Sequence, residues 1–438
     1  MTVRCLHALI IGQLLGWEAV ATEPESELLF SLQTHPVICE TRNLEAVLSK
    51  KGEAPKLRLI ADKSFGQQTA WASLGPPGER WNFEQRENLE ATVKNTSTAK
   101  VTVTLWVVSS HGWDAVGDEA TLEPREEQQL SCDLREAYPD GTPKIDPTSI
   151  REIRIMLQRT APGASVEVTT LKATRKIETW IRPGGRLDVP EMEHGRPAPG
   201  RRVRYQLPSD RGTRIYSALY LPPEWQAGKR YPIIAEYPGN AFYSAKRCWS
   251  TGRPEQCVMG YGITSGKGAI WISLPFVDRK SGRIAENGFG SKDGNDTCAH
   301  ALAAMQDLCA NWGGDPERLF LSGFSRGAIA CGYIGLANEE LASMWKGIIA
   351  CQHYDGSAWN QSNMGGALQR APRFKGSAIF QIDNDRSKYA PLEERSDPHI
   401  EWTWRKSGLN YHATAMFLDD RPLMQELRLW FTRHSSPD

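Results

Sequence analysis

The sequence lacks an excess of charge of either sign. Lysine plus arginine and aspartate plus glutamate both number 52, so the formal net charge is zero, and no long run of one sign interrupts the chain. Proteins that bind nucleic acid or anionic membranes by electrostatic attraction usually concentrate positive charge in such runs or patches. We therefore expect neither nucleic acid nor a membrane surface to be the main partner.

Long apolar segments, internal repeats and low-complexity tracts are also missing. A membrane-spanning helix needs about 20 consecutive apolar residues, and residues 6–15, like every later apolar segment, fall short of that length. Residues 6–15 follow Arg4 and precede Ala19-Val20-Ala21, the small-residue pattern of a signal-peptide cleavage site. We predict a signal peptide at residues 1–21 and a secreted or periplasmic protein. The alternative is a short buried helix.

Cysteine and histidine spacings typical of metal sites are absent. No C-x-x-C pair and no cluster of cysteine and histidine has zinc spacing, so the cysteines predict no metal site. Loss of Cys5 with the signal peptide would leave eight of the nine cysteines, an even number compatible with disulfides in an oxidising compartment. Cys248 and Cys257 are spaced to close one loop, and the remaining pairings stay open.

What the chain does contain is two kinds of pattern in succession. Its 438 residues, 40% of them hydrophobic, suffice for two domains. In residues 22–180, apolar and polar residues alternate with period two, which predicts a β-sandwich of the jelly-roll type. Residues 181–202, rich in proline, glycine and charge, suit a linker. In residues 203–438, strand-like and helix-like segments alternate, which predicts a mostly parallel sheet flanked by helices.

The expected elements can be placed by residue number. The predicted strands are residues 56–60, 89–94, 101–108, 127–132, 150–157 and 165–171 in the first domain, and 203–207, 216–221, 231–237, 269–274, 318–321, 347–350, 377–382 and 400–405 in the second. One predicted helix is capped by Asp296 or Thr297 and ends at Gly313-Gly314. The last one is capped by Asp419 or Asp420 and starts at Pro422.

The pentapeptide Gly323-Phe324-Ser325-Arg326-Gly327 indicates catalytic chemistry. It lies between the strand-like residues 318–322 and the small-residue helix expected at 327–336, which is the setting of a nucleophile elbow. In so sharp a turn the serine is strained and its flanking glycines approach each other closely. We predict Ser325 as a nucleophile and the Arg326 N–H as an oxyanion donor.

A serine hydroxyl needs a general base to act as a nucleophile at neutral pH. In strand-helix folds that use this elbow, an acid and then a histidine follow the serine along the chain. The histidines after Ser325 are His353, His399, His412 and His434. Only His412 falls in the loop between the last strand and the last helix, which favours it as the base. Its alternative role is that of a solvated loop residue.

Three aspartates are candidates for the carboxylate that orients the base. The strand at residues 377–382 is followed by Asp383-Asn384-Asp385. Asp385 is favoured because the acid typically lies a few residues past this strand, and Asp383 is the close competitor. Asp355, after the preceding strand, is the third candidate. Each of them is equally a residue type expected in turns.

A second oxyanion donor is expected after the strand at residues 231–237. The sequence there is Pro238-Gly239-Asn240, in which glycine lets the backbone approach a substrate closely. We predict the N–H of Asn240 as the donor. The alternative is an ordinary Pro-Gly turn.

Taken together, these motifs resemble those of the α/β-hydrolase superfamily. The motifs are Pro238-Gly239-Asn240, the run Asp315-Pro316-Glu317-Arg318 leading into the pentapeptide, Asp385 and His412. Residues 313–327 are similar to secreted esterases of the polyhydroxybutyrate-depolymerase, feruloyl-esterase and acetylxylan-esterase kind, and to prolyl-oligopeptidase-like hydrolases. The resemblance covers roughly residues 203–434. It implies a Ser325–His412–Asp385 triad, an acyl-enzyme and no cofactor.

The first domain faintly resembles jelly-roll modules of carbohydrate-active enzymes. Trp71, Trp81, Trp106 and Trp113 are suited to stacking on sugar rings, and equally to filling the core of a sandwich. The leading interpretation of the whole chain is an exported esterase whose ester substrate is carried by a polysaccharide. A prolyl-oligopeptidase-like peptidase ranks lower because no β-propeller repeats precede the catalytic part. A non-catalytic binding protein on the same scaffold is the third interpretation.

Basic residues near the predicted site bear on the substrate. Arg326, Lys246 and Arg247 are compatible with an acidic substrate, and equally with a solvated surface. The acyl and alcohol groups of the substrate and the oligomeric state have no readable signal in the sequence.

Overall fold

The computed structural model describes residues 27–28, 37–49, 56–62, 69–109, 115–158, 161–181, 185–244, 248–409 and 412–436. The predicted signal peptide at residues 1–21 lies outside this part of the chain, as do Trp113, Lys246 and Arg247.

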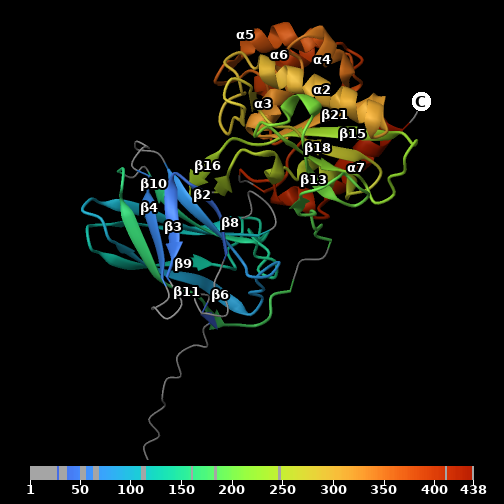
Figure 1. Ribbon diagram of the computed structural model, residues 1–438. Helices are drawn as coiled ribbons and strands as arrows, with labels where there is room; N and C mark the ends of the chain where they lie inside the picture. The colour runs from blue at the N-terminus through green and yellow to red at the C-terminus, as the bar shows by residue number, and fades with distance from the viewer. Residues whose placement is uncertain are drawn as a thin grey trace, which may run out of the picture.

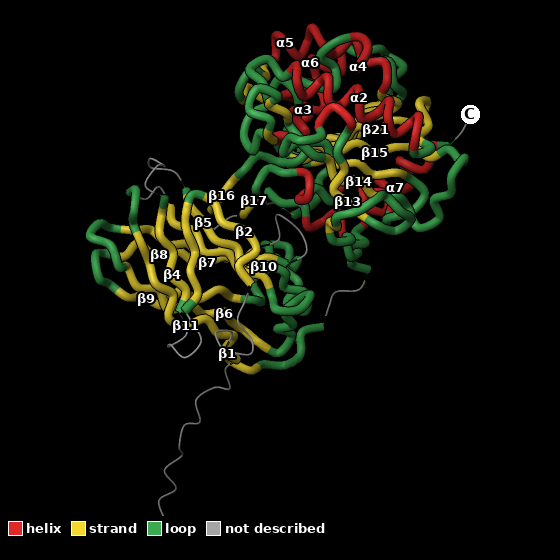
Figure 2. Tube along the Cα trace, in the orientation of Figure 1, coloured by secondary structure: helices red, strands yellow, loops and turns green. Residues whose placement is uncertain are grey.

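The N-terminal part consists of two antiparallel sheets packed face to face (Figures 1 and 2). One sheet has the order β3-β4-β11-β6-β9, with β1 paired to β11, and the other has the order β2-β5-β10-β7-β8. The strands are β1 (Glu27–Leu28), β2 (Val37–Arg42), β3 (Leu44–Leu48), β4 (Leu57–Ala61), β5 (Ala70–Gly75), β6 (Arg86–Asn95), β7 (Val101–Val108), β8 (Ala115–Leu122), β9 (Glu127–Asp133), β10 (Glu152–Gln158) and β11 (Ser165–Lys176).

Alternation explains how these strands bury one face. In β6, Leu89, Ala91 and Val93 are buried and alternate with more exposed residues. They share one core with Leu57 and Leu59 of β4 and with residues of the opposite sheet. Each strand predicted in this part is present. β5 was not predicted because all six of its residues are buried, so its sequence carries no alternation.

The tryptophans of this part belong to its interior. Trp71 and Trp106 are 1% and 0% exposed, and Trp81 is 8% exposed. The Arg154 guanidinium covers the Trp71 ring at 3.8 Å from its centroid. These three tryptophans therefore fill the core of the sandwich. The alternative prediction, that they stack on sugar rings, is wrong for them.

The C-terminal part is built on one nine-stranded sheet of order β12-β13-β14-β18-β15-β21-β22-β25-β26. From β18 to β26 neighbouring strands are parallel, whereas β14 pairs antiparallel with both β13 and β18. The strands are β12 (Met192–Glu193), β13 (Arg202–Tyr205), β14 (Ser217–Tyr220), β15 (Tyr231–Tyr237), β18 (Ile270–Ser273), β21 (Gly314–Phe324), β22 (Trp345–Cys351), β25 (Ala378–Ile382) and β26 (Glu401–Arg405).

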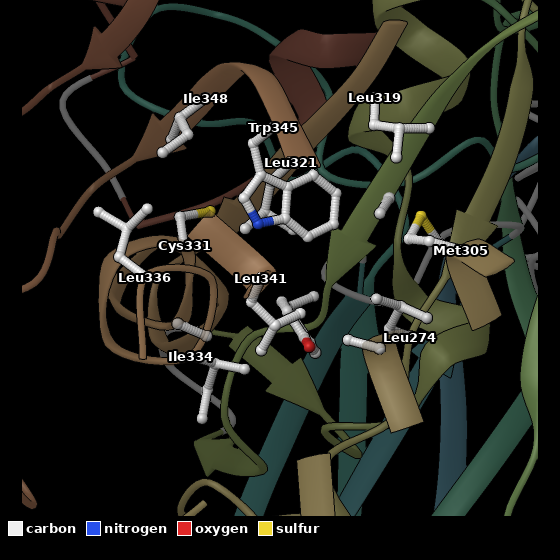
Figure 3. Close-up of a cluster of buried hydrophobic side chains, with 14 of the residues drawn as sticks. Leu274, Met305, Leu319, Leu321, Cys331, Ile334, Leu336, Leu341, Trp345 and Ile348 are labelled. Carbon is white, nitrogen blue, oxygen red and sulfur yellow. The ribbon is translucent and has the colours of Figure 1, made fainter. Parts of the chain in front are cut away.

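Helices cover both faces of this sheet (Figure 1). One face packs on α2 (Asn295–Asn311), α3 (Arg326–Tyr333), α4 (Glu339–Met344), α5 (Met364–Arg370) and α6 (Arg386–Arg395). The other face packs on α1 (Met259–Thr264) and α7 (Pro422–Ser435). Figure 3 shows part of the first interface, where Leu319 and Leu321 of β21 lie near Met305 of α2 and Leu341 of α4.

Small two-stranded hairpins and short 3-10 turns complete this part. The hairpins pair β16 (Phe242–Ser244) with β17 (Cys248–Ser250), β19 (Val277–Asp278) with β20 (Arg283–Ile284), and β23 (Ser357–Trp359) with β24 (Ser362–Asn363). The 3-10 turns are η1 (Pro208–Asp210), η2 (Pro254–Gln256), η3 (Ala371–Arg373) and η4 (Ala415–Leu418).

Two predicted helix caps are wrong. Helix α2 begins after Gly294, whose φ is 75°, while Asp296 accepts a hydrogen bond from the Arg279 N–H at 2.9 Å. Helix α7 does begin at Pro422, but its N-cap is Arg421. Asp419 instead holds the Arg421 guanidinium at 2.7–2.9 Å. At α2 a contact with a residue 17 positions away takes the Asp296 side chain, and at α7 a contact with a residue two positions away takes the Asp419 side chain.

The predicted disulfide between Cys248 and Cys257 is also wrong, because Cys257 is a free thiol. Its side chain is buried, and its Sγ contacts the Glu236 carbonyl oxygen at 4.0 Å. Burial raises the pKa of this thiol well above its usual value.

The described residues contain neither a cluster suited to a metal ion nor a membrane-spanning helix. Within the ranges given above, no group of histidine, cysteine, aspartate and glutamate side chains is arranged to hold a metal ion. No helix in the same ranges is long and apolar enough to cross a membrane.

Ion pairs connect the two parts of the molecule. Arg253 contacts Glu40 of β2 at 3.2 Å, and Arg42 of β2 pairs with Glu286. Farther along, Arg421 contacts Asp140 at 3.3 Å. The β16–β17 hairpin lies beside the sandwich in this region (Figures 1 and 2).

Candidate active site

Ser325 occupies a strained turn between β21 and α3. Its φ and ψ are 56° and −117°, outside the regions that non-glycine residues favour. Such a conformation costs about 1–3 kcal/mol and persists only where the surrounding structure enforces it. Here the Ser325 N–H donates to the Cys351 carbonyl at 2.9 Å, at the end of the neighbouring strand β22. The turn therefore fixes the backbone of the serine at the carboxyl edge of the sheet.

The flanking glycines are required by close backbone contacts. A Cβ atom at Gly323 would lie 2.2 Å from the Gly327 carbonyl carbon. A Cβ atom at Gly327 would lie 2.0 Å from the Tyr237 carbonyl oxygen. Real Cβ atoms do not approach other heavy atoms so closely, so both positions exclude any side chain at this turn.

The structure brings Ser325 and His412 together. Ser325 Oγ lies 2.9 Å from His412 Nε2, although 87 residues separate them in sequence. His412 lies between β26 and η4, in the loop that precedes the last helix. Its ring packs against Phe324, with 4.6 Å between ring centroids, and lies 5.6 Å from the His353 ring.

The surroundings of His412 favour its neutral form. Burial and the nearby His353 lower the pKa of His412 to about 4. A neutral imidazole can accept the serine proton through Nε2, whereas a protonated imidazolium cannot. The pair is therefore in the protonation state required of a nucleophile and its base throughout the neutral pH range.

The structure does not bring Asp385 to His412. Asp385 is the N-cap of α6 and accepts hydrogen bonds from the Ser387 N–H at 2.9 Å and the Ser387 hydroxyl at 2.8 Å. Asp355 is likewise committed elsewhere, since the Arg370 guanidinium binds its two oxygens at 2.7 and 2.8 Å. Asp385 is therefore engaged as a helix cap, and Asp355 is engaged in a buried ion pair.

Asp383 is connected to the histidine loop indirectly. It follows β25 with a φ of 55°, and its carboxylate accepts hydrogen bonds from the Ser407 N–H at 2.7 Å and the Ser407 hydroxyl at 2.6 Å. The Ser407 hydroxyl accepts a hydrogen bond from the Leu409 N–H at 3.1 Å. Asp383 thus anchors the segment that leads into His412, and it also accepts a hydrogen bond from the Gln352 amide at 3.2 Å.

Two backbone N–H groups lie where oxyanion donors are expected. The N–H of Arg326 is in the first turn of α3, where a helix has no internal acceptor for it. The N–H of Asn240 has no acceptor among the described residues, whereas the next N–H, of Ala241, donates to the Glu286 carbonyl at 2.9 Å. Gly327 packs directly on Tyr237 and Pro238, which places the start of α3 against the turn that holds Asn240.

The Arg326 side chain has a role that the sequence did not reveal. Its guanidinium is 1% exposed and therefore does not face a substrate. One terminal nitrogen donates to the carbonyls of Gly239 and Gly252, both at 2.8 Å. The other donates to the carbonyls of Ala285 and Gly288, at 3.1 and 3.0 Å. Arg326 thereby joins three separate loops, including the turn after β15 that holds Asn240.

The four backbone carbonyls and an aromatic ring compensate the burial of the Arg326 charge. The guanidinium carbon lies 4.0 Å from the centroid of the Phe276 ring, an arrangement favoured by cation–π attraction. Burial nevertheless lowers the pKa of Arg326 to about 9. Because charge-assisted hydrogen bonds are stronger than neutral ones, the four carbonyl contacts are expected to hold these loops firmly.

A second serine, histidine and aspartate cluster lies elsewhere in this part. Ser217 Oγ is 3.2 Å from His300 Nε2, and His300 Nδ1 is 3.1 Å from Asp210 Oδ2. All three residues are at most 1% exposed. Although burial alone would raise the pKa of Asp210, His300 and Arg279 lower it. No substrate can reach this cluster, so its polar groups serve packing rather than catalysis.

No protein-family model and no curated protein matches the chain. Solved structures that resemble parts of it include a thermostable esterase, with 11% identity over 81% of this chain and 97% of its own and a TM-score of 0.34. A sugar hydrolase from Lactococcus lactis has 12% identity over 53% and 97%, with a TM-score of 0.36. A family 30 carbohydrate-binding module has 15% identity over 36% and 92%, with a TM-score of 0.26.

Some of the similar structures are much longer than this chain. The chain spans about a quarter of two of them, 23% of PfGH50B and 25% of an exo-beta-agarase. Identity and TM-score are low throughout, so these similarities assign no function to the chain.

Proposed function

We propose that the protein is a serine hydrolase that cleaves carboxylic esters, on an α/β-hydrolase type of scaffold. The observation that carries the proposal is the 2.9 Å contact between Ser325 Oγ and His412 Nε2 at a strained strand-to-helix turn. A partly buried, neutral histidine in contact with a serine hydroxyl is the minimal pair for nucleophilic acyl transfer. The strain of the turn supports the same role, because strained serines of this kind are typical of nucleophile elbows.

The proposed reaction passes through an acyl-enzyme. Ser325 Oγ attacks the ester carbonyl while His412 Nε2 takes its proton, and the negative oxygen is stabilised by the N–H groups of Arg326 and Asn240. His412 returns the proton to the leaving alcohol. Water, activated by the same histidine, then hydrolyses the acyl group from Ser325. No cofactor takes part in these steps.

The role of the acid goes to Asp383 in this proposal. Asp385 and Asp355 are held by α6 and by Arg370, whereas Asp383 holds the loop of the base through Ser407. Asp383 therefore acts as a positioning residue, which fixes where His412 lies. The substrate class proposed from the sequence is an ester carried by a polysaccharide, met after export by way of residues 1–21.

Hydrolysis of p-nitrophenyl acetate tests the proposal. The Ser325→Ala variant is expected to lose at least about 10⁴-fold in kcat, as variants of catalytic serines do. Ser217→Ala is the matched control, because this serine also contacts a histidine but is 1% exposed. Equal rates for Ser325→Ala and wild type would favour a non-catalytic binding protein. Cleavage of peptides with no cleavage of esters would favour a peptidase.

A further inference from the structure

A cleft of about 920 Å³ lies between the sandwich and the nine-stranded part. The sandwich contributes residues 40–43, which form the end of β2 and the turn after it. The other wall includes residues 283–287, around and after β20. Small-molecule pockets typically measure about 300–1,000 Å³, so this cleft has room for an extended ligand.

Positive charge predominates in the cleft. Its lining contains three carboxylates, from Glu40, Asp278 and Glu286, against five guanidinium groups. The arginines are Arg42, Arg204, Arg214, Arg253 and Arg283. The excess of two positive charges contrasts with the zero net charge of the whole chain.

Two of the arginines are already neutralised. Arg42 and Arg253 both pair with Glu286, the latter at 2.9 Å, and Arg253 also contacts Glu40 at 3.2 Å. These pairs connect the two walls of the cleft and fix its width. The Glu286 carboxylate is therefore already paired and does not neutralise the other arginines.

Three arginines remain for a ligand. Arg204, Arg214 and Arg283 form no ion pair with any residue in the described ranges. Arg204 lies over the Tyr216 ring, with 4.0 Å between the guanidinium carbon and the ring centroid. That contact leaves its hydrogen-bond donors unused, and guanidinium groups match carboxylate and sulfate oxygens in bidentate geometry.

The cleft adjoins the proposed catalytic site through one shared wall. Ala285 and Glu286 line the cleft, while their carbonyls accept hydrogen bonds from the Arg326 guanidinium at 3.1 Å and from the Ala241 N–H at 2.9 Å. Ala241 directly follows Asn240 of the oxyanion turn. A chain bound in the cleft would therefore lie against the segment that supports the oxyanion donors.

We propose that this cleft binds an anionic oligosaccharide, whose carboxylate or sulfate groups pair with Arg204, Arg214 and Arg283. The inference rests on the proposed function, in that it names the class of chain on which the ester is carried. Polar side chains that also line the cleft, namely Asn43, Ser281 and Asn287, suit sugar hydroxyls. Several separate arginines also fit an extended polyanion better than one compact phosphate.

Nucleic acid fits the cleft less well. Single-stranded nucleic acids are bound largely by stacking their bases on aromatic side chains. Tyr216 is the aromatic residue that lines the cleft, and it is 7% exposed, with Arg204 on its ring and its hydroxyl donating to Glu255 at 2.9 Å. The cleft therefore offers charge without a stacking platform.

Isothermal titration calorimetry on the full-length Ser325→Ala protein tests the proposal independently of catalysis. The ligands are a hexauronate, a sulfated hexasaccharide, a neutral hexasaccharide and a single-stranded oligonucleotide. We expect one of the two anionic sugars to bind, with at least about tenfold weaker binding in Arg214→Gln/Arg283→Gln, because two charge-assisted contacts are lost. The matched control is Arg395→Gln/Lys267→Gln, which removes two exposed charges that do not line the cleft.

The four ligands separate the possible outcomes. Tighter binding of the hexauronate identifies carboxylate as the recognised group, and tighter binding of the sulfated sugar identifies sulfate. The proposal is overturned if neither anionic sugar binds, if the cleft variant binds as tightly as the control variant, or if the oligonucleotide binds more tightly than both sugars. Failure here with an active wild-type esterase would leave the proposed function intact, whereas an inactive wild type that still binds the sugar would count only against the function.

Discussion

Asp383 and Asp385 are two residues apart in sequence, yet they form different contacts. Asp383 holds Ser407 in the loop of His412, and Asp385 caps α6. We expect Asp383→Asn to lower kcat for p-nitrophenyl acetate by about 10²-fold, since a displacement of about 1 Å in a catalytic group has effects of this size. Asp385→Asn should keep a kcat close to wild type.

The kcat values of these two variants can contradict the assignment of Asp383. A large loss in Asp385→Asn with normal turnover in Asp383→Asn would restore the triad that the sequence suggested. Circular dichroism of both variants checks that the fold is kept.

His353 influences the protonation of the proposed base. Burial and His353 together lower the pKa of His412 to about 4. Because only neutral His412 accepts the serine proton, kcat/KM should fall on the acid side with a pKa near this value. In His353→Asn, a repelling imidazole is removed, so the acid limb should move to higher pH, towards the usual histidine value of about 6.5.

The pH profile of kcat/KM measures this shift directly. His399→Asn is the matched control, because His399 is an exposed histidine outside the site, on the segment before β26. An unchanged acid limb in His353→Asn, or the same shift in both variants, would show that His353 does not act on His412.

At the residue scale, the sequence predicted the pairing of Ser325 with His412, which the structure brings into contact, but not which aspartate is connected to the histidine loop. The order of Ser325 and His412 along the chain, and the glycines around the serine, follow from the geometry of one turn. The choice among Asp355, Asp383 and Asp385 depends on contacts with Arg370, Ser407 and the first turn of α6. The partners of Asp355 and Asp383 lie 15 and 24 residues away, so no local pattern shows these two contacts.

At the scale of structural elements, the Arg326 side chain connects the loops around the Ser325 turn. Its guanidinium joins the turn after β15, the loop after β17 and the loop after β20. Arg326→Lys keeps the charge but cannot reach four carbonyls. We expect kcat to fall by about 10²-fold, comparable to the loss of one oxyanion donor, with little change in KM.

A purely structural role for Arg326 would give a different result. Arg154→Lys is the control, since Arg154 is also a buried arginine on an aromatic ring, in the sandwich. Both variants should melt at lower temperature, but only Arg326→Lys should lose kcat per active site. Equal kcat values for the two variants would contradict the positioning role.

Strands with an alternating apolar pattern were predictable, whereas the contacts between distant loops were not. The sequences of β6, β7 and β11 alternate along part of their length, while β5 is buried throughout and was not predicted. The acceptors of Arg326 lie on residues 239, 252, 285 and 288, which are distant from it in sequence. Backbone carbonyls are present at every residue, so no sequence pattern marks those that a buried cation will bind.

Glu286 links the two parts of the whole molecule. It pairs with Arg42 of the sandwich and with Arg253 of the nine-stranded part, and its side chain is 15% exposed. We expect Glu286→Gln to lower the free energy of unfolding by about 1–3 kcal/mol, because two partly buried cations lose their partner. Denaturant unfolding measures the change.

The control for this prediction is an exposed ion pair. Glu426→Gln breaks a pair with Arg405 in which both side chains are more than 40% exposed, and such pairs contribute about 0.2–1 kcal/mol. Equal effects of the two substitutions would show that Glu286 does not hold the parts together.

Covalent labelling of Ser325 by a fluorophosphonate probe, located by mass spectrometry of the labelled peptide, tests the central claim most directly. The account predicts rapid labelling of Ser325 in the wild type, none in Ser325→Ala, and a rate reduced by orders of magnitude in His412→Ala. Ser217, buried beside His300, should stay unlabelled. No label on Ser325, or equal rates in wild type and His412→Ala, would contradict the account.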